Sequence, residues 1–112
     1  MHIMRELVGR QLSSVEFVRD YVQLRFDGPC LTALNLPSIS RDSIVVRSGD
    51  SGFRDELCAQ IGVEVAAVAI SDEQLALTFN TSVTFSVSLR KEDYTGPEAL
   101  NYAGTDGTCV VI

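Results

Sequence analysis

Apolar and polar residues alternate along three stretches of this chain. Residues 75–79 and 83–89 carry Leu, Phe or Val at every second position, with small side chains, mostly Ser and Thr, between them. Residues 21–26 repeat the alternation with an apolar residue at positions 22, 24 and 26. Because successive side chains of a strand point to opposite faces, each stretch has one apolar and one polar face. The pattern predicts antiparallel strands with one face in the core and the other in solvent.

The pattern of residues 61–89 occurs once before in the chain. Moved back by 53 positions, this segment aligns with residues 8–36, and five of the aligned positions are identical. The identities are Gly9 with Gly62, Val15 with Val68, Leu24 with Leu77, Phe26 with Phe79, and Leu36 with Leu89. All are Gly or large apolar residues, the types that determine turns and cores. We therefore predict that residues 1–112 form a single domain containing a repeated three-stranded β-meander.

A short helix is predicted between the two copies, over about residues 51–61. Phe53, Leu57 and Ile61 lie four positions apart and would form one apolar stripe on such a helix. The polar residues 50–51 are expected to cap its first turn with a side-chain oxygen. The helix would pack its apolar stripe against the predicted sheet.

The remaining segments complete a mainly β domain. Residues 38–43 are predicted as a polar connection, residues 44–46 as a short strand, and residues 100–103 with 109–112 as a final hairpin. We predict a mainly β fold (α+β by element count) of about eight strands, in which the two repeated meanders form a sandwich or a partly closed barrel.

The first strands and the strand predicted for residues 30–36 are candidates for exposed sheet edges. The latter has apolar residues on both faces, so its amphipathic pattern is less regular. Unpaired edges are sites for further strand pairing, and a symmetric homodimer would cover them. A homodimer is therefore one prediction for the protein in solution.

Composition is that of an ordinary soluble domain, with 46% hydrophobic and 21% charged residues. No apolar run approaches the roughly 18 residues that a membrane span needs, and residues 1–7 are not followed by the apolar segment of a secretory signal. We expect no membrane association and a cytoplasmic location. Cys30, Cys58 and Cys109 have neither a disulfide nor a metal-site spacing, so they are predicted to be small buried apolar residues.

The net charge of −6 is concentrated in the second half of the chain. Residues 1–56 hold seven Arg against eight acids, whereas residues 57–112 hold two basic residues against seven acids. A nucleic-acid-binding protein would be expected to have a basic stripe, and the sequence has none. An acidic surface instead favours encounter with a basic protein partner.

Candidate chemistry is sparse. His2 is the only histidine, and histidine is the commonest general acid–base and metal ligand near neutral pH. We therefore expect no enzymatic activity and no cofactor or metal. The candidate binding residues are Tyr94, Glu98 and Tyr102, in a Gly-Pro-containing segment without a counterpart in the first copy. The alternative is that both tyrosines cover the open end of the core.

Residues of the second copy and the tail carry a resemblance to known proteins. The residues are Ile61-Gly62 followed by Val65, then Leu75-x-Leu77-x-Phe79, and later Tyr94-x-Gly96-Pro97-Glu98-Ala99. Together they resemble a group of small bacterial β-rich proteins, some of which accompany polymorphic toxins as immunity proteins. The resemblance implies a non-enzymatic binding protein, of the kind that inhibits a basic effector.

Two other functions stay open at this point. One is a small-ligand-binding or enzymatic domain with a pocket near Tyr94, Glu98 and Tyr102, which a pocket lined by a carboxyl of perturbed pKa would favour. The other is a structural homo-oligomeric module. A protruding acidic face without such a pocket would instead favour the binding of a basic protein.

Overall fold

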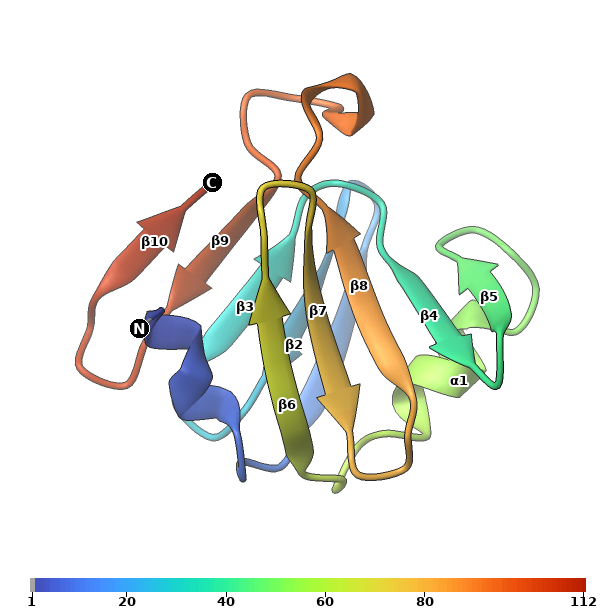
Figure 1. Cartoon of the computed structure of the whole chain (residues 1–112), viewed down its shortest axis with the longest axis horizontal. Helices are drawn as coiled ribbons and strands as arrows, with labels where there is room; N and C mark the ends of the chain where they lie inside the picture. Colours follow the sequence, from blue (N-terminus) through green and yellow to red (C-terminus); the bar gives the residue numbers. More distant parts are fainter. Residues whose placement is uncertain (1) are drawn as a thin grey trace.

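The computed structural model describes residues 2–112 and contains ten strands in two antiparallel five-stranded sheets (Figure 1). The strands are β1 (Ser14–Val18), β2 (Tyr21–Arg25), β3 (Cys30–Ala33), β4 (Ser38–Arg41), β5 (Ile44–Arg47), β6 (Val65–Ile70), β7 (Gln74–Phe79), β8 (Thr84–Ser88), β9 (Leu100–Ala103) and β10 (Cys109–Val111). The helices are α1 (Phe53–Cys58) and the 3₁₀ helices η1 (Ile3–Leu7) and η2 (Lys91–Asp93).

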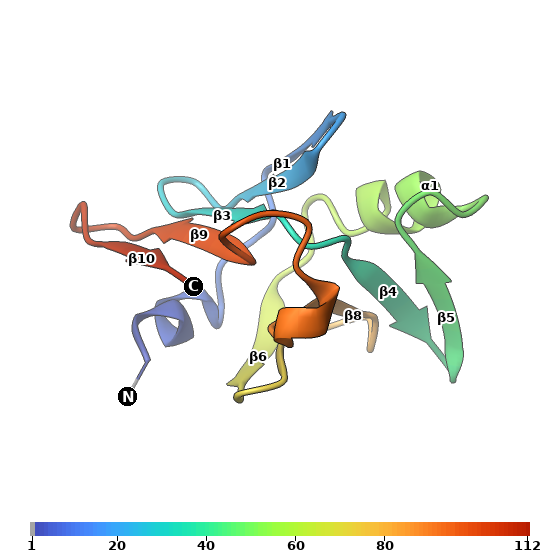
Figure 2. The same cartoon turned by 90° about the horizontal axis from the view of Figure 1, so that it is seen from above.

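The two sheets form a sandwich around one core. One sheet has the strand order β1-β2-β3-β9-β10 and the other β5-β4-β8-β7-β6. Figure 2 shows them as two layers, with α1 near one open end and η1 near the other. The predicted mainly β fold, with meanders β1–β3 and β6–β8 and one short helix between them, is confirmed. The structure decides between the two predicted forms, because neither sheet closes into a barrel.

The core is built from the inward faces that the alternation predicted. Its largest fully buried side chains, with less than 2% of their surface exposed, include Phe26, Phe53, Phe79, Phe85 and Tyr102. Burying an aromatic side chain of this size, compared with leaving it exposed to water, stabilises the folded state by roughly 1.5–3 kcal/mol. Both meanders contribute to this layer, so neither sheet has a core of its own.

Each meander is followed by a hairpin that pairs with the other meander. The β4–β5 hairpin follows β3 in the chain, but β4 pairs with β8. The β9–β10 hairpin follows β8 in the chain, but β9 pairs with β3. Each sheet therefore combines three strands from one half of the chain with two from the other half, as Figure 1 shows.

The two halves meet through a reciprocal pair of backbone hydrogen bonds. The N–H of Gly9 donates to the Val65 carbonyl (2.8 Å), and the N–H of Gly62 donates to the Leu12 carbonyl (2.7 Å). Gly9 and Gly62 both have positive φ, +87° and +90°, a conformation that is accessible to glycine at little cost. The equivalence that the sequence pattern predicts at these positions therefore appears as a local twofold relation between the halves.

The alignment of the two copies shifts by one residue after the second strand of each meander. In the β2–β3 pair Leu24 lies opposite Leu31, whereas its counterpart Leu77 lies opposite Phe85 in the β7–β8 pair. The Phe26 N–H donates to the Pro29 carbonyl, whereas the Phe79 N–H donates to the Val83 carbonyl, so the β7–β8 turn holds one more residue. This extra residue moves every later position of the second copy. A shift of one residue exchanges the two faces of a strand.

The predicted equivalence of Leu36 and Leu89 is therefore wrong. Leu89 is 8% exposed and belongs to the core, whereas 63% of the Leu36 surface is exposed. Leu36 lies after the end of β3, in the short connection to β4. An apolar side chain is thus held at the surface where the sequence pattern predicts a buried one.

Two strand predictions are corrected. The segment predicted as a polar connection, residues 38–43, contains β4, because Ile39 alternates with Ser38 and Ser40 and is buried on the core side. The strand predicted as a possible edge, residues 30–36, is the central strand β3, which pairs with β2 on one side and β9 on the other. The first strand, β1, does lie at a sheet edge.

The helix is shorter than predicted, spanning Phe53–Cys58 rather than residues 51–61. Its cap is Gly52, without a side-chain hydrogen bond, because the Asp50 carboxylate accepts the Arg47 N–H (2.9 Å) instead. Phe53 and Leu57 are buried as predicted, but Ile61 is 45% exposed. The apolar stripe therefore ends one turn earlier than the sequence spacing indicates.

The predicted burial of the cysteines is also wrong. Cys58 and Cys109 are exposed and Cys30 is half-buried, and all three are free thiols. Cys30 and Leu31 lie on opposite faces of β3, and Leu31 takes the core face. Within residues 2–112 no helix combines the length and the apolar character that are needed to cross a membrane.

Candidate binding surface around Leu36

The connections that follow the two meanders differ in length. Residues 34–37 join β3 to β4, whereas residues 89–99 join β8 to β9. The longer connection contains η2 and protrudes beyond the end of the sandwich (Figure 1). It is the largest departure from the internal repeat, and its side chains border the short connection that carries Leu36.

Three surface hollows share Leu36 as a wall. We call the first, of about 470 Å³, the serine hollow, because Ser38, Ser86 and Ser88 line it. A second hollow, of about 620 Å³, lies at the start of α1, and a third, of about 440 Å³, is lined by residues 95–98. Leu36 is thus the side chain common to three neighbouring hollows, which makes it the candidate contact residue of this surface.

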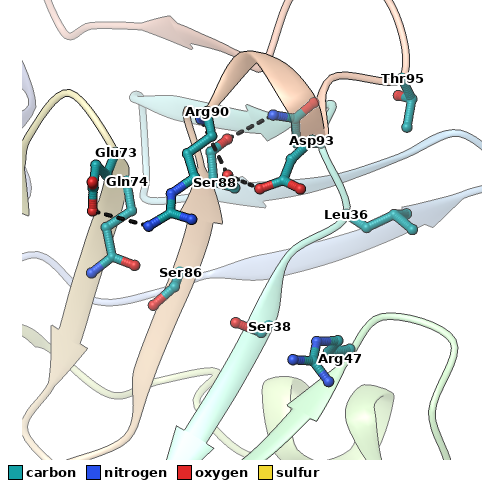
Figure 3. A pocket seen from close by; sticks show the side chains of 11 residues that line it. Leu36, Ser38, Arg47, Glu73, Gln74, Ser86, Ser88, Arg90, Asp93 and Thr95 are labelled. Atoms are coloured by element: carbon teal, nitrogen blue, oxygen red, sulfur yellow. Dashed lines mark hydrogen bonds and ion pairs between the residues drawn. The ribbon is translucent and has the colours of Figure 1, made fainter.

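The floor of the serine hollow follows from the alternation within three adjacent strands. Ser38 of β4 lies opposite Ser86 of β8, and Ser88 lies opposite Gln74 of β7. These positions point away from the core, and Figure 3 shows Ser38, Ser86 and Gln74 spread across the neighbouring strands below Arg90. Small hydroxyl side chains leave room above the sheet, so the hollow is a direct result of the outward-facing serines.

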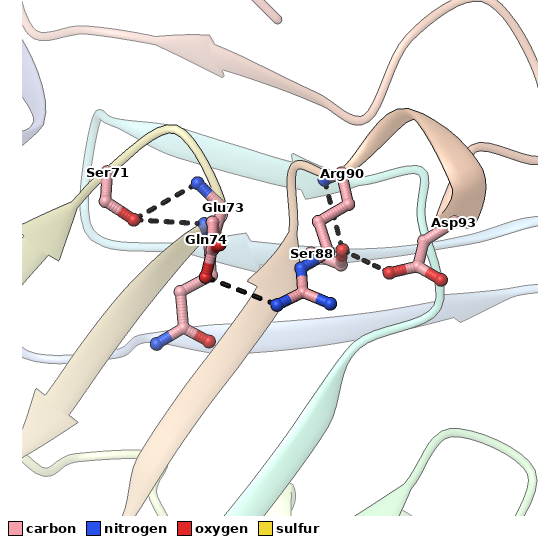
Figure 4. Close-up of polar contacts among 6 residues, drawn as sticks. All are labelled: Ser71, Glu73, Gln74, Ser88, Arg90 and Asp93. Atoms are coloured by element: carbon pink, nitrogen blue, oxygen red, sulfur yellow. Dashed lines mark hydrogen bonds and ion pairs between the residues drawn. The ribbon is translucent and has the colours of Figure 1, made fainter.

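Acidic side chains surround the upper rim of the serine hollow (Figure 4). Arg90 Nη2 lies 3.3 Å from Glu73 Oε2, and the Ser88 hydroxyl donates to Asp93 Oδ2 (2.6 Å). The hydrogen bond to Glu73 and the charges of Glu73, Glu92 and Asp93 raise the pKa of Arg90. Arg90 therefore shares this end of the hollow with two lining carboxylates, Glu73 and Asp93.

Backbone contacts hold Glu73 and Gln74 at this rim. The Ser71 hydroxyl oxygen accepts hydrogen bonds from the N–H groups of Glu73 (3.2 Å) and Gln74 (3.3 Å), as Figure 4 shows. The Glu73 carbonyl accepts the N–H of Leu89 (2.8 Å). A serine that binds the backbone two and three residues ahead fixes a tight turn. The Glu73 carboxylate is thus presented from an ordered turn.

Asn35 forms part of the wall of the serine hollow and is 1% exposed. Its backbone N–H donates to the Ala99 carbonyl (2.9 Å), and its Nδ2 donates to the Ser88 carbonyl (2.6 Å). Its Oδ1 is buried and has no hydrogen-bond partner among the residues that the structure describes. Buried side-chain acceptors are normally satisfied, so this amide oxygen requires an explanation.

Arg47 lines the serine hollow from β5, away from the acidic rim (Figure 3). Its side chain is exposed and forms no ion pair within residues 2–112. The hollow therefore has a positive end at Arg47 and a negative end at Glu73 and Asp93.

The three predicted binding residues are not brought together in one hollow. Tyr94 is half-buried and packs against the core, and Glu98 lines the third hollow around Leu36. With its amide nitrogen turned toward Glu98, Asn101 lies 3.2 Å from Glu98 Oε1. Tyr102 is 1% exposed, and its hydroxyl donates to Glu6 Oε2 (2.5 Å).

The Tyr102–Glu6 contact joins β9 to η1. Burial, and then the hydrogen bond to Glu6, raise the pKa of the Tyr102 hydroxyl well above its usual range. The same hydrogen bond is the largest influence that lowers the pKa of Glu6, which also accepts the Thr105 hydroxyl (2.9 Å). Tyr102 therefore stays protonated and donates to an ionised carboxylate.

No metal or family assignment extends this description. Residues 2–112 contain no group of three or more His, Cys, Asp or Glu side chains placed to hold a metal ion. Comparison with protein-family models, curated proteins and solved structures gives no match to this chain. The candidate surface is thus defined by its geometry and charge alone.

The sequence pattern does not identify Leu36, Asn35 or Arg47 as site residues. The available signal was the unequal length of two turns, residues 27–28 between Phe26 and Pro29 against residues 80–82 between Phe79 and Val83. A one-residue difference there changes which side chains of the next strand and connection face the core.

Proposed function

We propose that the protein is a non-enzymatic binding module that docks a basic protein through the surface around Leu36. The observation that carries this proposal is the exposure of Leu36 (63%) at the junction of three hollows. The buried centre of a protein contact is more apolar than its rim, so an exposed leucine between hollows fits the centre of such a contact.

The charge around this surface supports a basic partner. The three hollows around Leu36 are lined by six carboxylates and four arginines, a net charge of −2; the residues are Asp20, Asp50, Asp55, Glu73, Asp93 and Glu98, with Arg19, Arg47, Arg54 and Arg90. Carboxylates at the edge of an apolar contact accelerate encounter with a positively charged protein and disfavour an acidic one. In the form implied by the resemblance to immunity proteins, the partner is a toxic effector and this protein is its inhibitor.

The proposal is tested by affinity capture with paired variants. The purified protein, Leu36→Asp and Ile44→Asp are each immobilised and exposed to a lysate of the cells that make the protein. Ile44 is a matched control, because it is an apolar residue of similar exposure (68%) on β5 and lines none of the three hollows around Leu36.

A stoichiometric basic protein is expected on the wild type and on Ile44→Asp, and it should be absent from Leu36→Asp. Raising the salt from about 0.1 M to 1 M shortens the range of charge interactions about threefold, so the captured protein should be released progressively. Capture that does not depend on Leu36, capture of an acidic protein, or no capture would contradict the proposal.

A further inference from the structure

The two sheets have four edge strands, β1, β10, β5 and β6, and two of these edges are partly closed by the chain itself. At β6 the Val65 carbonyl accepts the Gly9 N–H (2.8 Å), and the Val65 N–H donates to the Arg10 carbonyl (2.9 Å). At β5 the Asp50 carboxylate accepts the Arg47 N–H (2.9 Å), and the Asp50 N–H donates to the Arg47 carbonyl (2.9 Å). Such contacts occupy backbone groups that would otherwise be sites for pairing with another chain.

The edge at β10 is open. The Ile112 N–H donates to the Leu100 carbonyl (3.0 Å), so these two residues form a hydrogen-bonded pair of the β9–β10 ladder. Bonded and non-bonded pairs alternate in an antiparallel ladder, so the N–H and C=O groups of Cys109 and Val111 point away from β9. No other segment within residues 2–112 forms a backbone hydrogen bond with these four groups. Figure 1 shows β10 as the outermost strand of its sheet, with its free edge toward solvent.

The β10 edge also lacks charge. Residues 109–111 are uncharged, Cys109 is exposed, and 56% of the Val111 surface is exposed. The β1 edge differs, because Glu16 is the middle residue of that strand. A copy paired along the whole of β1 would place Glu16 opposite Glu16 of the copy, and like charges directly opposite are destabilising. In a chain of net charge −6, β10 is thus an edge at which two copies can meet without opposing carboxylates.

We propose that β10 pairs antiparallel with β10 of a second copy, about a twofold axis at Val110, so that two five-stranded sheets join edge to edge. In this register Cys109 lies opposite Val111 of the second copy, and the symmetry forms this pair twice. Each pair exchanges two backbone hydrogen bonds, so the four free groups of each copy all obtain partners. A register shifted by two residues in either direction keeps only half of these hydrogen bonds.

The side chains of the strand fit the same arrangement. On the outer face Cys109 would contact Val111 of the second copy, and on the inner face Val110, which packs against the core, would meet its own counterpart. Residues 109–111 line none of the three hollows around Leu36, so each copy of the dimer keeps that surface free. The contact is one strand wide and therefore small, so the dimer should be reversible and populated at high protein concentration.

Analytical ultracentrifugation tests the proposal, with protein from about 10 μM to about 1 mM. The average mass should rise from that of one chain toward that of two. Val111→Pro removes an outward N–H, spares the β9 ladder and should weaken the dimer about tenfold, because each dimer loses two hydrogen bonds. Val45→Pro is the matched control, since Val45 is similarly exposed (53%) on the β5 edge and should dimerise as the wild type does. Its N–H also points outward, because the Ser48 N–H donates to the Pro37 carbonyl and the bonded pairs alternate from there. Circular dichroism checks that both variants fold.

A cross-link tests the register without proline. In a chain with Cys30→Ser and Cys58→Ser, Val111→Cys places a thiol opposite Cys109 of the second copy. The Cα atoms of such a hydrogen-bonded pair lie about 5.5 Å apart, which suits a disulfide. Mild oxidation should give a covalent dimer, and adding Cys109→Ser should abolish it. A mass of one chain at every concentration, equal weakening by the two proline variants, or a covalent dimer that forms without Cys109 would each overturn the proposal.

Discussion

The two halves of the chain, residues 3–47 and 53–111, share an arrangement of elements but differ at one end. Each half has a short helix, a glycine turn, a three-stranded meander and a hairpin that pairs with the other half. The connection before the hairpin is residues 34–37 in the first half and residues 89–99 in the second. The repeated parts build the sandwich, whereas the candidate binding surface lies where the halves differ.

The difference also shows how a small change in length affects a surface. One additional residue in the β7–β8 turn keeps Leu89 in the core, and its absence from the first copy leaves Leu36 exposed. The long connection of the second half then brings Asp93 and Thr95 to the same hollow as Leu36. An asymmetric surface thus arises on a repeated framework whose second strands keep matching buried positions, Val22 and Leu24 in β2 and Leu75 and Leu77 in β7.

The largest expected effect tests the equivalence of the halves. Phe26 and Phe79 occupy matching positions and are 0% and 1% exposed. Phe26→Ala and Phe79→Ala should each lower the free energy of unfolding by about 3–5 kcal/mol, because each leaves a cavity in the shared core. Urea unfolding followed by circular dichroism measures both. A loss for one variant that is less than half of the other would show that the halves contribute unequally.

The next pair of variants compares the burial of Leu89 in the second half with that of Leu36 in the first. Leu89→Ala should cost about 2–4 kcal/mol of unfolding free energy, since the side chain is buried. Leu36→Ala should cost less than about 0.5 kcal/mol, since its side chain is mostly in solvent. The same urea experiment compares the two variants. Similar losses would mean that Leu36 is a core residue, and the binding surface proposed around it would have to be abandoned.

The smallest effect concerns a contact that has no counterpart in the first half. Tyr102→Phe removes the hydroxyl that donates to Glu6 and should cost about 1.5 kcal/mol at neutral pH, the lower end of the range for a hydrogen bond to a charged group. The residue at the matching position of the first half is Ile39. It lies opposite Phe85 of β8, just as Tyr102 lies opposite Leu31 of β3. Ile39 has no hydroxyl group and cannot form such a hydrogen bond. Unfolding in urea at a series of pH values measures the cost.

The pH dependence of that cost follows from the two pKa shifts. The pKa of Glu6 lies below its ordinary value of 4.5, so its contribution is present above pH 4.5 and is lost as the pH falls through the lowered pKa. The pKa of Tyr102 is raised above its ordinary 10.0, so its contribution is present below pH 10.0 and decreases as the pH rises beyond it. The stability difference between wild type and Tyr102→Phe should therefore be largest between these values. A difference that is constant down to pH 2 would contradict the assigned hydrogen bond.

Alternation along the chain was sufficient to predict the layers of the fold. It identified the buried faces of β2, β7 and β8 and the final hairpin, because side-chain direction in a strand depends only on position along it. It could not predict that β4 pairs with β8 and β9 with β3, because alternation contains no information on which strand is a neighbour. The polar appearance of residues 38–43 concealed β4, whose only buried side chain is Ile39.

The candidate surface was less accessible from the sequence. The excess of acids in the second half was visible, but their position around Arg90 depends on the folding of two turns. Asparagine is common in loops, so the sequence gives no sign that Asn35 is buried. Its backbone and that of Leu34 are held against Ala99 by hydrogen bonds to the Ala99 carbonyl. The sequence analysis placed the candidate site in the long connection, whereas Leu36 comes from the short one.

The exchange of hairpins makes folding of this chain resemble the association of two subunits. Neither half can complete a five-stranded sheet from its own strands, so each depends on the other as protomers depend on each other in a domain-swapped dimer. The short connection between β5 and α1 sets the effective concentration of one half near the other, and folding of the intact chain is independent of protein concentration for that reason. The arrangement is therefore that of a hairpin-swapped homodimer whose two protomers are joined into one chain.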